Sequence, residues 1–208
     1  MSIPCTKTRA IPWNNIPGKS NFIITSPTVA RLAKGDPGLL RVLKSSVSHT
    51  FGDQTKEKLE SLGIEVKLYK AQSGFELCQH LDPSQTYTFL GPESPAIDYA
   101  TTLQERGSQC KMVPLYKTLP ESHLDQPDQK ILLKDFKGIV SFASPSAVDG
   151  FFKSFPSDFG QRQDVWAAVI GDTTRQACEP SFKVVHKAKR QSIESLAKLC
   201  QDLLKGIS

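Results

Sequence analysis

The feature that constrains this sequence most is an internal repeat. A shift of 118 positions carries Ser26-Pro27 onto Ser144-Pro145, and an apolar run precedes each pair. A shift of 119 positions carries residues 51–77 onto residues 170–196 without a gap. The second shift pairs Gly52, Asp53, Thr55, Val66, Gln72, Ser73 and Leu77 with Gly171, Asp172, Thr174, Val185, Gln191, Ser192 and Leu196. Ordered matches at nearly one offset indicate that the chain carries the same unit twice, with one loop insertion between the matched blocks.

Both copies are predicted to alternate strands with helices. Short apolar runs predict buried strands, and each Ser-Pro pair predicts a helix start, because serine is a good N-cap and proline suits the first helical position. The predicted strands are 22–24, 47–51, 64–68, 86–90, 111–115, 139–142, 165–170 and 182–186. The predicted helices start at Ser26, Ser73 and Ser144 or cover 55–62, 96–105, 174–179 and 192–204. This alternation predicts an α/β fold with parallel sheets and right-handed crossovers.

Two proline-bearing polar stretches, residues 4–18 and 119–130, are the best linker candidates. If the chain passes from one lobe to the other at each of these linkers, residues 1–18 and 116–208 form a discontinuous α/β lobe. Residues 19–115 are then inserted as a second α/β lobe. We expect the two lobes to face a shared ligand cleft.

Composition narrows the class of protein. Hydrophobic residues make up 38% and charged residues 23%, which is typical of a soluble globular enzyme. No apolar run reaches the length of a membrane span, and the N-terminus lacks a signal-peptide core, so we expect a cytoplasmic protein without membrane contact. The net charge of +5 mildly favours anionic partners, but the basic residues form no block, and nucleic acid is not expected. The cysteines are scattered singly, so no structural metal is expected.

Five loops at predicted strand ends are the candidate binding sites. They are small, bear hydroxyl groups or glycine, and each opens a helix; they cover residues 25–28, 52–55, 91–94, 143–146 and 171–174. Ligands of parallel α/β sheets bind outside the carboxyl ends of the strands, and free N–H groups at helix starts suit carboxylates or phosphates. Lys56 and Arg175 occupy equivalent positions in the first turn of their helices. Each could pair with a ligand anion or be a solvated surface charge. Asp53 and Asp172 could form an acid/base pair, although helix capping explains them better.

Several catalytic motifs are missing from the sequence. It contains no P-loop and no G-x-G-x-x-G, and its four histidines form no Ser-His-Asp set. His49 and His186 fall on predicted strands, where they are best interpreted as core or edge residues. The residues alone therefore predict an anion-binding cleft but do not indicate which reaction takes place there.

At these loops the chain resembles the uroporphyrinogen III synthase (HemD-type) family. The residues that carry the resemblance are TSPTV at 25–29, FGDQT at 51–55, VPLYKT at 113–118, SFASPSAV at 141–148, IGDTT at 170–174 and SIESLAKL at 192–199. The resemblance implies two flavodoxin-like lobes joined by a two-stranded linker. It also implies a hydro-lyase that cyclises hydroxymethylbilane, a linear tetrapyrrole with eight carboxylates, inverting ring D through a spiro intermediate and releasing water. No cofactor is implied.

The resemblance also assigns residue roles. Tyr116 aligns with the family's cleft tyrosine, which is proposed to assist departure of the substrate hydroxyl. Thr55, Ser146, Thr173 and Thr174 match positions near the substrate carboxylates. Ser26 and Ser144 are supporting candidates. A monomer is expected, with transient contact with the deaminase that forms the bilane.

The chain departs from the family pattern at its N-terminus. Only a short segment precedes the first linker, so we expect the first strand and helix of the discontinuous lobe to be missing. This departure keeps a second hypothesis open, a non-catalytic tetrapyrrole-binding or regulatory protein of the same fold. A third hypothesis, a two-lobed receptor for a small anion, rests on fold analogy alone.

Overall fold

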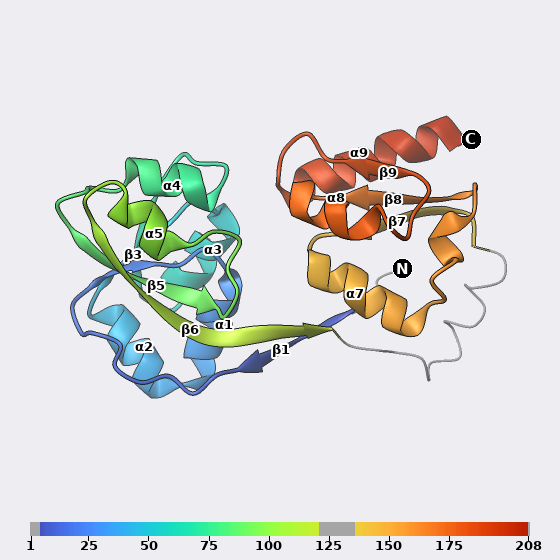
Figure 1. The fold of residues 1–208 in the computed structure, drawn as a ribbon. Helices are drawn as coiled ribbons and strands as arrows, with labels where there is room; N and C mark the ends of the chain where they lie inside the picture. The colour runs from blue at the N-terminus through green and yellow to red at the C-terminus, as the bar shows by residue number, and fades with distance from the viewer. Residues whose placement is uncertain (1–4, 121–135, 208) are drawn as a thin grey trace. The chain divides into compact units, whose positions relative to one another are not determined.

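A computed structural model describes residues 5–120 and 136–207 of the chain (Figure 1). The chain divides into two compact units, which are described separately. The insert unit is Arg9–Lys117, and the split unit combines Met1–Thr8 with Thr118–Ser208. Residues 9–18, 116 and 117 therefore lie in the same unit as residues 19–115. Most of the linker predicted at 119–130 lies outside the described residues.

The insert unit is built on a six-stranded sheet in the order β1-β6-β5-β2-β3-β4. Its strands are β1 (Thr6–Ala10), β2 (Asn21–Ile23), β3 (Val47–Thr50), β4 (Glu65–Leu68), β5 (Thr86–Pro92) and β6 (Gln109–Pro120). The five strands from β6 to β4 pair in parallel, while the arrows of β1 and β6 run in opposite directions in Figure 1. Both β1 and β6 continue across the boundary between the units.

Helices cover both faces of this sheet. On one face α1 (Pro27–Gly35), α2 (Pro37–Lys44) and α3 (Asp53–Glu60) pack against Phe22 of β2 and against Ile24, which directly follows this strand. On the other face α4 (Gly74–His80) and α5 (Tyr99–Gln104) pack against residues such as Ile23. The crossover helices change face after β4, so the strand order reverses between β2 and β5. The carboxyl ends of these two strands form the topological switch point, where open parallel sheets bind their ligands.

The split unit repeats the first half of this pattern. Its parallel strands β7 (Gly138–Phe142), β8 (Val165–Val169) and β9 (Val185–Lys187) lie in sequence order. Helices α7 (Pro145–Ser154) and α8 (Asp172–Cys178) cover one face, and α9 (Ile193–Ile207) covers the other. A short 3-10 turn, Phe159–Gln161, follows α7. The elements β7, α7, β8, α8, β9 and α9 thus correspond to β2, α1, β3, α3, β4 and α4, as the internal repeat predicts.

The predicted fold class, two α/β units with parallel sheets, is confirmed, and several element boundaries are corrected. Helix α2 is missing from the prediction, although Asp36 caps it before Pro37 by the same signal that starts α1. Helix α5 begins only after Asp98, which is its N-cap. Strand β9 begins at Val185 instead of residue 182, because Phe182 packs into the core ahead of the strand.

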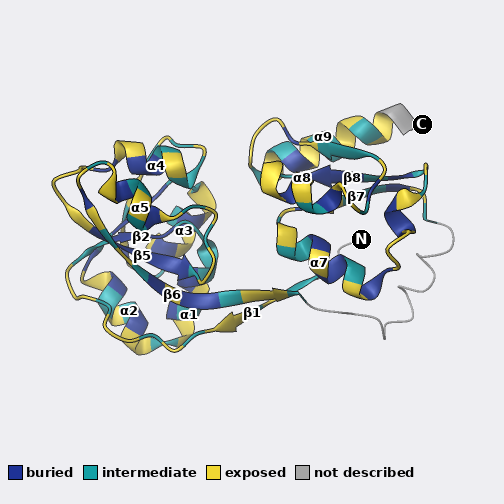
Figure 2. Ribbon diagram, in the orientation of Figure 1, coloured by how far each residue is buried: buried dark blue, intermediate teal, exposed yellow. Residues whose placement is uncertain are grey.

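Burial follows this layering in both units. The inner strands β2, β3, β5 and β8 are mostly buried, as the dark blue of β2 and β5 in Figure 2 shows, whereas β1, β4 and β9 contain no buried residue. The outward faces of the helices are yellow in Figure 2. The largest group of aromatic side chains fills the core of the split unit, where Phe151 stacks on Phe155 with ring centroids 4.1 Å apart. Cys5, from the N-terminal segment, packs against this same cluster. Cys5 therefore ties the start of the described chain to the split unit's core.

His49 on β3 is a buried histidine with a partner for each ring nitrogen. It is 4% exposed; Nδ1 lies 2.9 Å from the Tyr69 hydroxyl, and Nε2 lies 3.2 Å from Asn21 Oδ1. A neutral ring satisfies both contacts if Nε2–H donates to Asn21 and Nδ1 accepts from Tyr69. Burial first, and then the positive charge of Lys67, lower the pKa of His49 from 6.5 to about 4. The predicted role as a core histidine is confirmed.

This pKa shift predicts an acid-sensitive insert unit. Between pH 6.5 and about 4 the unfolded chain binds a proton at His49 that the folded chain does not. Stability is therefore fully present above pH 6.5 and falls towards pH 4, by about 2–3 kcal/mol. Urea unfolding across this range should show the loss, and His49→Gln should flatten the pH dependence relative to the parent chain. The exposed His80 lies in the same unit, and His80→Gln is the matched substitution control that keeps His49 in place. An unchanged slope in His49→Gln would contradict the assignment.

Candidate functional site

In the two Ser-Pro turns the serine side chain already caps the start of the helix. The Ser26 hydroxyl accepts a hydrogen bond from the N–H of Thr28 at 3.3 Å, and the Ser144 hydroxyl accepts one from Ala147 at 3.2 Å. The proline that follows each serine has no N–H to offer. Ser146 lies beside its cap, with its hydroxyl oxygen 3.1 Å from that of Ser144. Ser26 and Ser144 therefore act first as helix caps, which leaves few donors free at the starts of α1 and α7.

The starts of α3 and α8 have no side chain that caps their first N–H groups. Their N-cap residues are Gly52 and Gly171, and neither helix has a side-chain cap. The first N–H groups of a helix have no intrahelical acceptor, so those of α3 and α8 are available to an anion. The capping role predicted for Asp53 and Asp172 is wrong, since each is the first helical residue and not the residue before it.

The three candidate threonines at these starts differ in exposure. Thr55 is 3% exposed and Thr174 is 1% exposed, whereas the Thr173 side chain is exposed. The Thr55 hydroxyl oxygen lies beside the cap glycine, 3.5 Å from the place that a Cβ on Gly52 would occupy. Thr55 and Thr174 therefore pack inside the strand-to-helix turns and shape them. Thr173 is the threonine that can meet a ligand with its side chain.

The aspartate at the start of α8 is neutralised by a lysine from the neighbouring strand. Lys187, the last residue of β9, places its ammonium nitrogen 2.7 Å from the Asp172 carboxylate. Gln191 covers the same turn, because its side-chain carbon Cδ would lie 3.3 Å from a Cβ on Gly171. The loop after β9 and the start of α8 thus form one surface that exposes the cations Lys187, Lys189 and Arg190.

The equivalent surface of the insert unit has a different character. Leu68, Lys70 and Ala71 stand where the split unit has Lys187, Lys189 and Arg190. Leu68 is 42% exposed. The repeat therefore carries a cationic loop in one copy and a more apolar loop in the other. Sequence reasoning missed Lys187, although comparing the two copies position by position could have found it.

Tyr116 is a core residue of the insert unit. It lies within β6 rather than at its end, is 5% exposed, and packs in the same cluster as Leu90 and Leu115. Its carbonyl accepts a hydrogen bond from the N–H of Glu93 at 2.8 Å, beside a register shift between β5 and β6. The ring is therefore rigidly held, next to the turn that follows β5.

The two first-turn cations have partners within their own helices. Lys56 lies 3.8 Å from Glu60, and Arg175 lies 2.8 Å from Glu179. Pairs at this spacing stabilise a helix in water without any ligand. This favours the interpretation of Lys56 and Arg175 as solvated surface charges.

The sheets bring the remaining candidates together within each unit. Ser26 and Thr55 follow the neighbouring strands β2 and β3, while Tyr116 lies on β6, two strands away from β2. In the split unit the serine turn and the threonine turn follow the neighbouring strands β7 and β8. The cleft expected to join the candidates of the two units stays a prediction.

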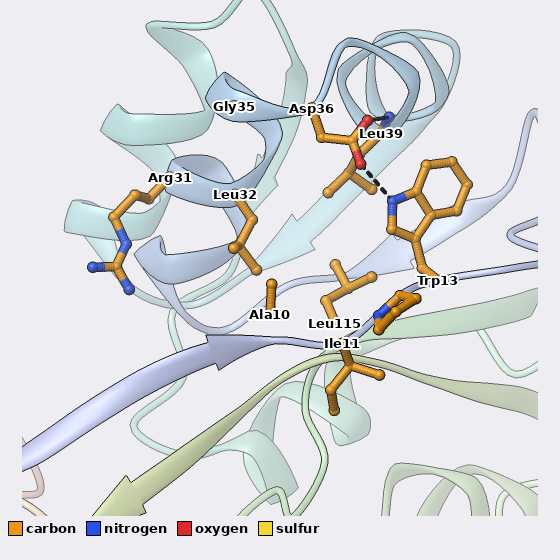
Figure 3. A pocket seen from close by; sticks show the side chains of 10 residues that line it. Ala10, Ile11, Trp13, Arg31, Leu32, Gly35, Asp36, Leu39 and Leu115 are labelled. Atoms are coloured by element: carbon orange, nitrogen blue, oxygen red, sulfur yellow. Dashed lines mark hydrogen bonds between the residues drawn. The ribbon is translucent and has the colours of Figure 1, made fainter. Parts of the chain in front are cut away.

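A cavity of about 660 Å³ lies in the insert unit between residues 10–13 and the helices α1 and α2 (Figure 3). Asp36 is its acidic group, and its carboxylate accepts hydrogen bonds from Trp13 Nε1 at 2.7 Å and from the N–H groups of Gly38 and Leu39 at 2.9 and 3.0 Å. The Leu39 N–H, then Trp13, hold the pKa of Asp36 below its usual value. This carboxylate anchors Trp13 on α2 and has little capacity left for a ligand.

Two further searches of the described residues concern metals and membranes. No group of three or more His, Cys, Asp or Glu residues within 5–120 and 136–207 could hold a metal ion. In the same ranges no helix combines the length and apolar character needed for a membrane crossing.

Comparison with known proteins shows one family throughout. A family model described as Uroporphyrinogen-III synthase HemD matches residues 8–198. A solved uroporphyrinogen-III synthetase from Helicobacter pylori superposes with a TM-score of 0.72 at 21% identity, covering 97% of this chain and 92% of that chain. A mutant uroporphyrinogen III synthase from Thermus thermophilus superposes with a TM-score of 0.56 at 18% identity, covering 97% and 88%. No protein with a curated description matches the chain. At these identities the solved structures show the fold.

Proposed function

Because the chain belongs to the uroporphyrinogen-III synthase HemD family, we propose that it is a uroporphyrinogen III synthase. In this proposal it is a hydro-lyase that converts hydroxymethylbilane into uroporphyrinogen III, with inversion of ring D and loss of water. The observation that carries the proposal is the family match over residues 8–198, which includes every candidate site residue.

The proposed route needs positioning more than strong chemical groups. Departure of the bilane hydroxyl together with a proton, as water, gives an azafulvene. The substituted carbon of ring D attacks the electrophilic methylene carbon of this azafulvene to form a spiro-pyrrolenine, which then rearranges. Because the bilane also closes unaided to the uninverted isomer I, the protein's main task is to favour one geometry of closure. Tyr116 assists departure of the hydroxyl, and its tight packing would hold the phenol in one place.

Substrate carboxylates bind to the open helix starts in this proposal. The free N–H groups of α3 and α8 and the exposed Thr173 are donors suited to carboxylates. An acidic residue at each start would repel a carboxylate, but Lys187 already neutralises Asp172 in the split unit. Ser26, Ser144 and Ser146 lie in the neighbouring turns. The buried Thr55 and Thr174 pack inside the strand-to-helix turns of α3 and α8 and hold the backbone of these turns in place.

The deciding experiment supplies freshly prepared hydroxymethylbilane to the full chain and measures the isomer ratio of the product. We expect isomer III to exceed the spontaneous isomer I, without any added cofactor. No enrichment of isomer III would overturn the synthase proposal. Binding of uroporphyrinogen without turnover would instead favour the non-catalytic tetrapyrrole-binding protein. We further expect a monomer that receives the bilane in transient contact with the deaminase that makes it.

A further inference from the structure

A groove with no assigned role runs between helices α1 and α3 of the insert unit. Its volume is about 660 Å³, within the range of small-molecule sites. Thr28 and Gln54 line one end, and Ser61 lines the other. Three cations line its length: Arg31 and Lys34 from α1 and Lys58 from α3.

These three cations have no acidic counterpart in the groove. None of its lining residues is an aspartate or glutamate, and α1 contains no acidic residue at all. Among the described residues no ion pair involves Arg31, Lys34 or Lys58. Arg31 also lines the cavity of Figure 3, where its guanidinium extends away from Asp36, the acidic residue of that cavity. The groove therefore presents uncompensated positive charge.

The internal repeat shows that the fold does not require these charges. The equivalent positions on α7 and α8 of the split unit are Asp149, Phe152 and Ala177. Helices α1 and α3 pack through apolar residues of the core cluster, such as Ala30, Ala33 and Leu59. The basic side chains of the groove are thus present between α1 and α3 and absent from the equivalent positions of α7 and α8.

The groove begins where the proposed substrate site lies. Thr28 is two residues after Ser26, and Gln54 precedes Thr55, so one end of the groove opens at the carboxyl ends of β2 and β3. From there the cations follow the two helices towards their other ends. A ligand that bears several carboxylates on flexible arms could occupy the strand-end loops and extend along the groove.

We propose that the α1–α3 groove is a polycarboxylate subsite, which binds carboxylate arms of the tetrapyrrole away from the reacting ring. The identity of this ligand rests on the proposed function, whereas the preference for a polyanion rests on the charges of the groove. Arg31 and Lys34 are spaced three residues apart on one helix, so they face the same side and can engage neighbouring carboxylates. A monocarboxylate would meet one cation and bind weakly, because exposed charge pairs contribute little singly.

The test is an equilibrium titration of the full chain with uroporphyrin III, a fluorescent porphyrin with eight carboxylates, at about 50 mM and about 300 mM salt. The variant Arg31→Ala/Lys34→Ala/Lys58→Ala should raise the dissociation constant about 5- to 20-fold at low salt and reduce its salt dependence. Arg31→Lys/Lys34→Arg/Lys58→Arg keeps the charges and should bind like the parent chain.

A matched control removes the same charge elsewhere. Lys183, Lys198 and Lys205 are exposed lysines of the split unit, and their triple alanine variant should bind uroporphyrin within about 2-fold of the parent chain. Equal weakening in both triple variants, or none in the groove variant, would overturn the subsite. The isomer assay is run in parallel: a parent chain that makes no isomer III fails as a synthase, while the titration still decides on the groove. Urea unfolding of the groove variant verifies that it is folded.

Discussion

A Tyr116→Phe protein is expected to form uroporphyrinogen III about 100-fold more slowly than the parent chain, at nearly unchanged KM. The hydroxyl is the group proposed to assist departure of the substrate hydroxyl, and phenylalanine lacks it. The ring itself is 5% exposed and packs among apolar side chains, so phenylalanine preserves the core. Because the proposed carboxylate contacts lie at other positions, binding should change little. Initial rates of isomer III formation over a range of bilane concentrations would separate kcat from KM.

Tyr87→Phe provides a control for this prediction. Tyr87 is also buried in the insert unit, and its hydroxyl donates to the carbonyl of Asp82 at 3.1 Å. Its removal should lower the free energy of unfolding by about 1 kcal/mol and leave turnover within 2-fold. Unchanged turnover in Tyr116→Phe would remove Tyr116 from the chemistry. A rise in KM alone would assign it to substrate binding instead.

The second large effect concerns the stability of the split unit. Gly150→Ala should lower its free energy of unfolding by about 2–3 kcal/mol. A Cβ on Gly150 would collide with the carbonyl oxygen of Cys5, so the backbone at Cys5 or α7 has to move. Alanine is otherwise favoured over glycine inside a helix by about 1 kcal/mol, so a net loss of stability can only come from this close approach. We expect Cys5 to leave the aromatic core in the variant.

The two tryptophans allow this loss to be located. Trp13 lies in the insert unit and Trp166 in the split unit, so in a Trp13→Phe background the fluorescence change on urea unfolding reports the split unit. Gly35→Ala in the insert unit is the matched control, because a Cβ there meets nothing within 4 Å. Its effect, followed by the fluorescence of Trp13 in a Trp166→Phe background, should stay below about 1 kcal/mol. An unchanged unfolding midpoint in Gly150→Ala would show that the N-terminal segment does not pack on α7.

Much of the fold can be predicted because its signals are local. The serine caps of α1 and α7 form hydrogen bonds to residues two or three positions away. Each Ser-Pro pair therefore encodes a helix start without help from distant residues. Helix α2 obeys the same rule through Asp36 and Pro37, so the signal for this helix is also present in the sequence. The repeat then extends these local signals to both units, since each copy places the same elements in the same order.

The candidate site could be predicted only in part, because its chemistry depends on contacts between elements. The predicted loops 25–28, 52–55, 143–146 and 171–174 follow the neighbouring parallel strands β2 and β3 and β7 and β8, as predicted. The fifth predicted loop, 91–94, is wrong in part, because Gly91 and Pro92 belong to β5 and α5 begins only after Asp98. Tertiary packing decided which groups within them are free. It buries Thr55 and Thr174, exposes Thr173 and encloses Tyr116 in the core.

The repeated α/β unit, the Ser-Pro helix starts and the family to which the chain belongs can all be inferred from the amino-acid sequence. How the charges are paired depends on tertiary packing. Asp172 and Lys187 are 15 residues apart in the chain and meet because β9 ends beside the start of α8. Arg31 and Lys58 line one groove because α1 and α3 pack side by side. Electrostatic interactions act through space, so their pattern follows from the positions of the elements rather than from their order along the chain.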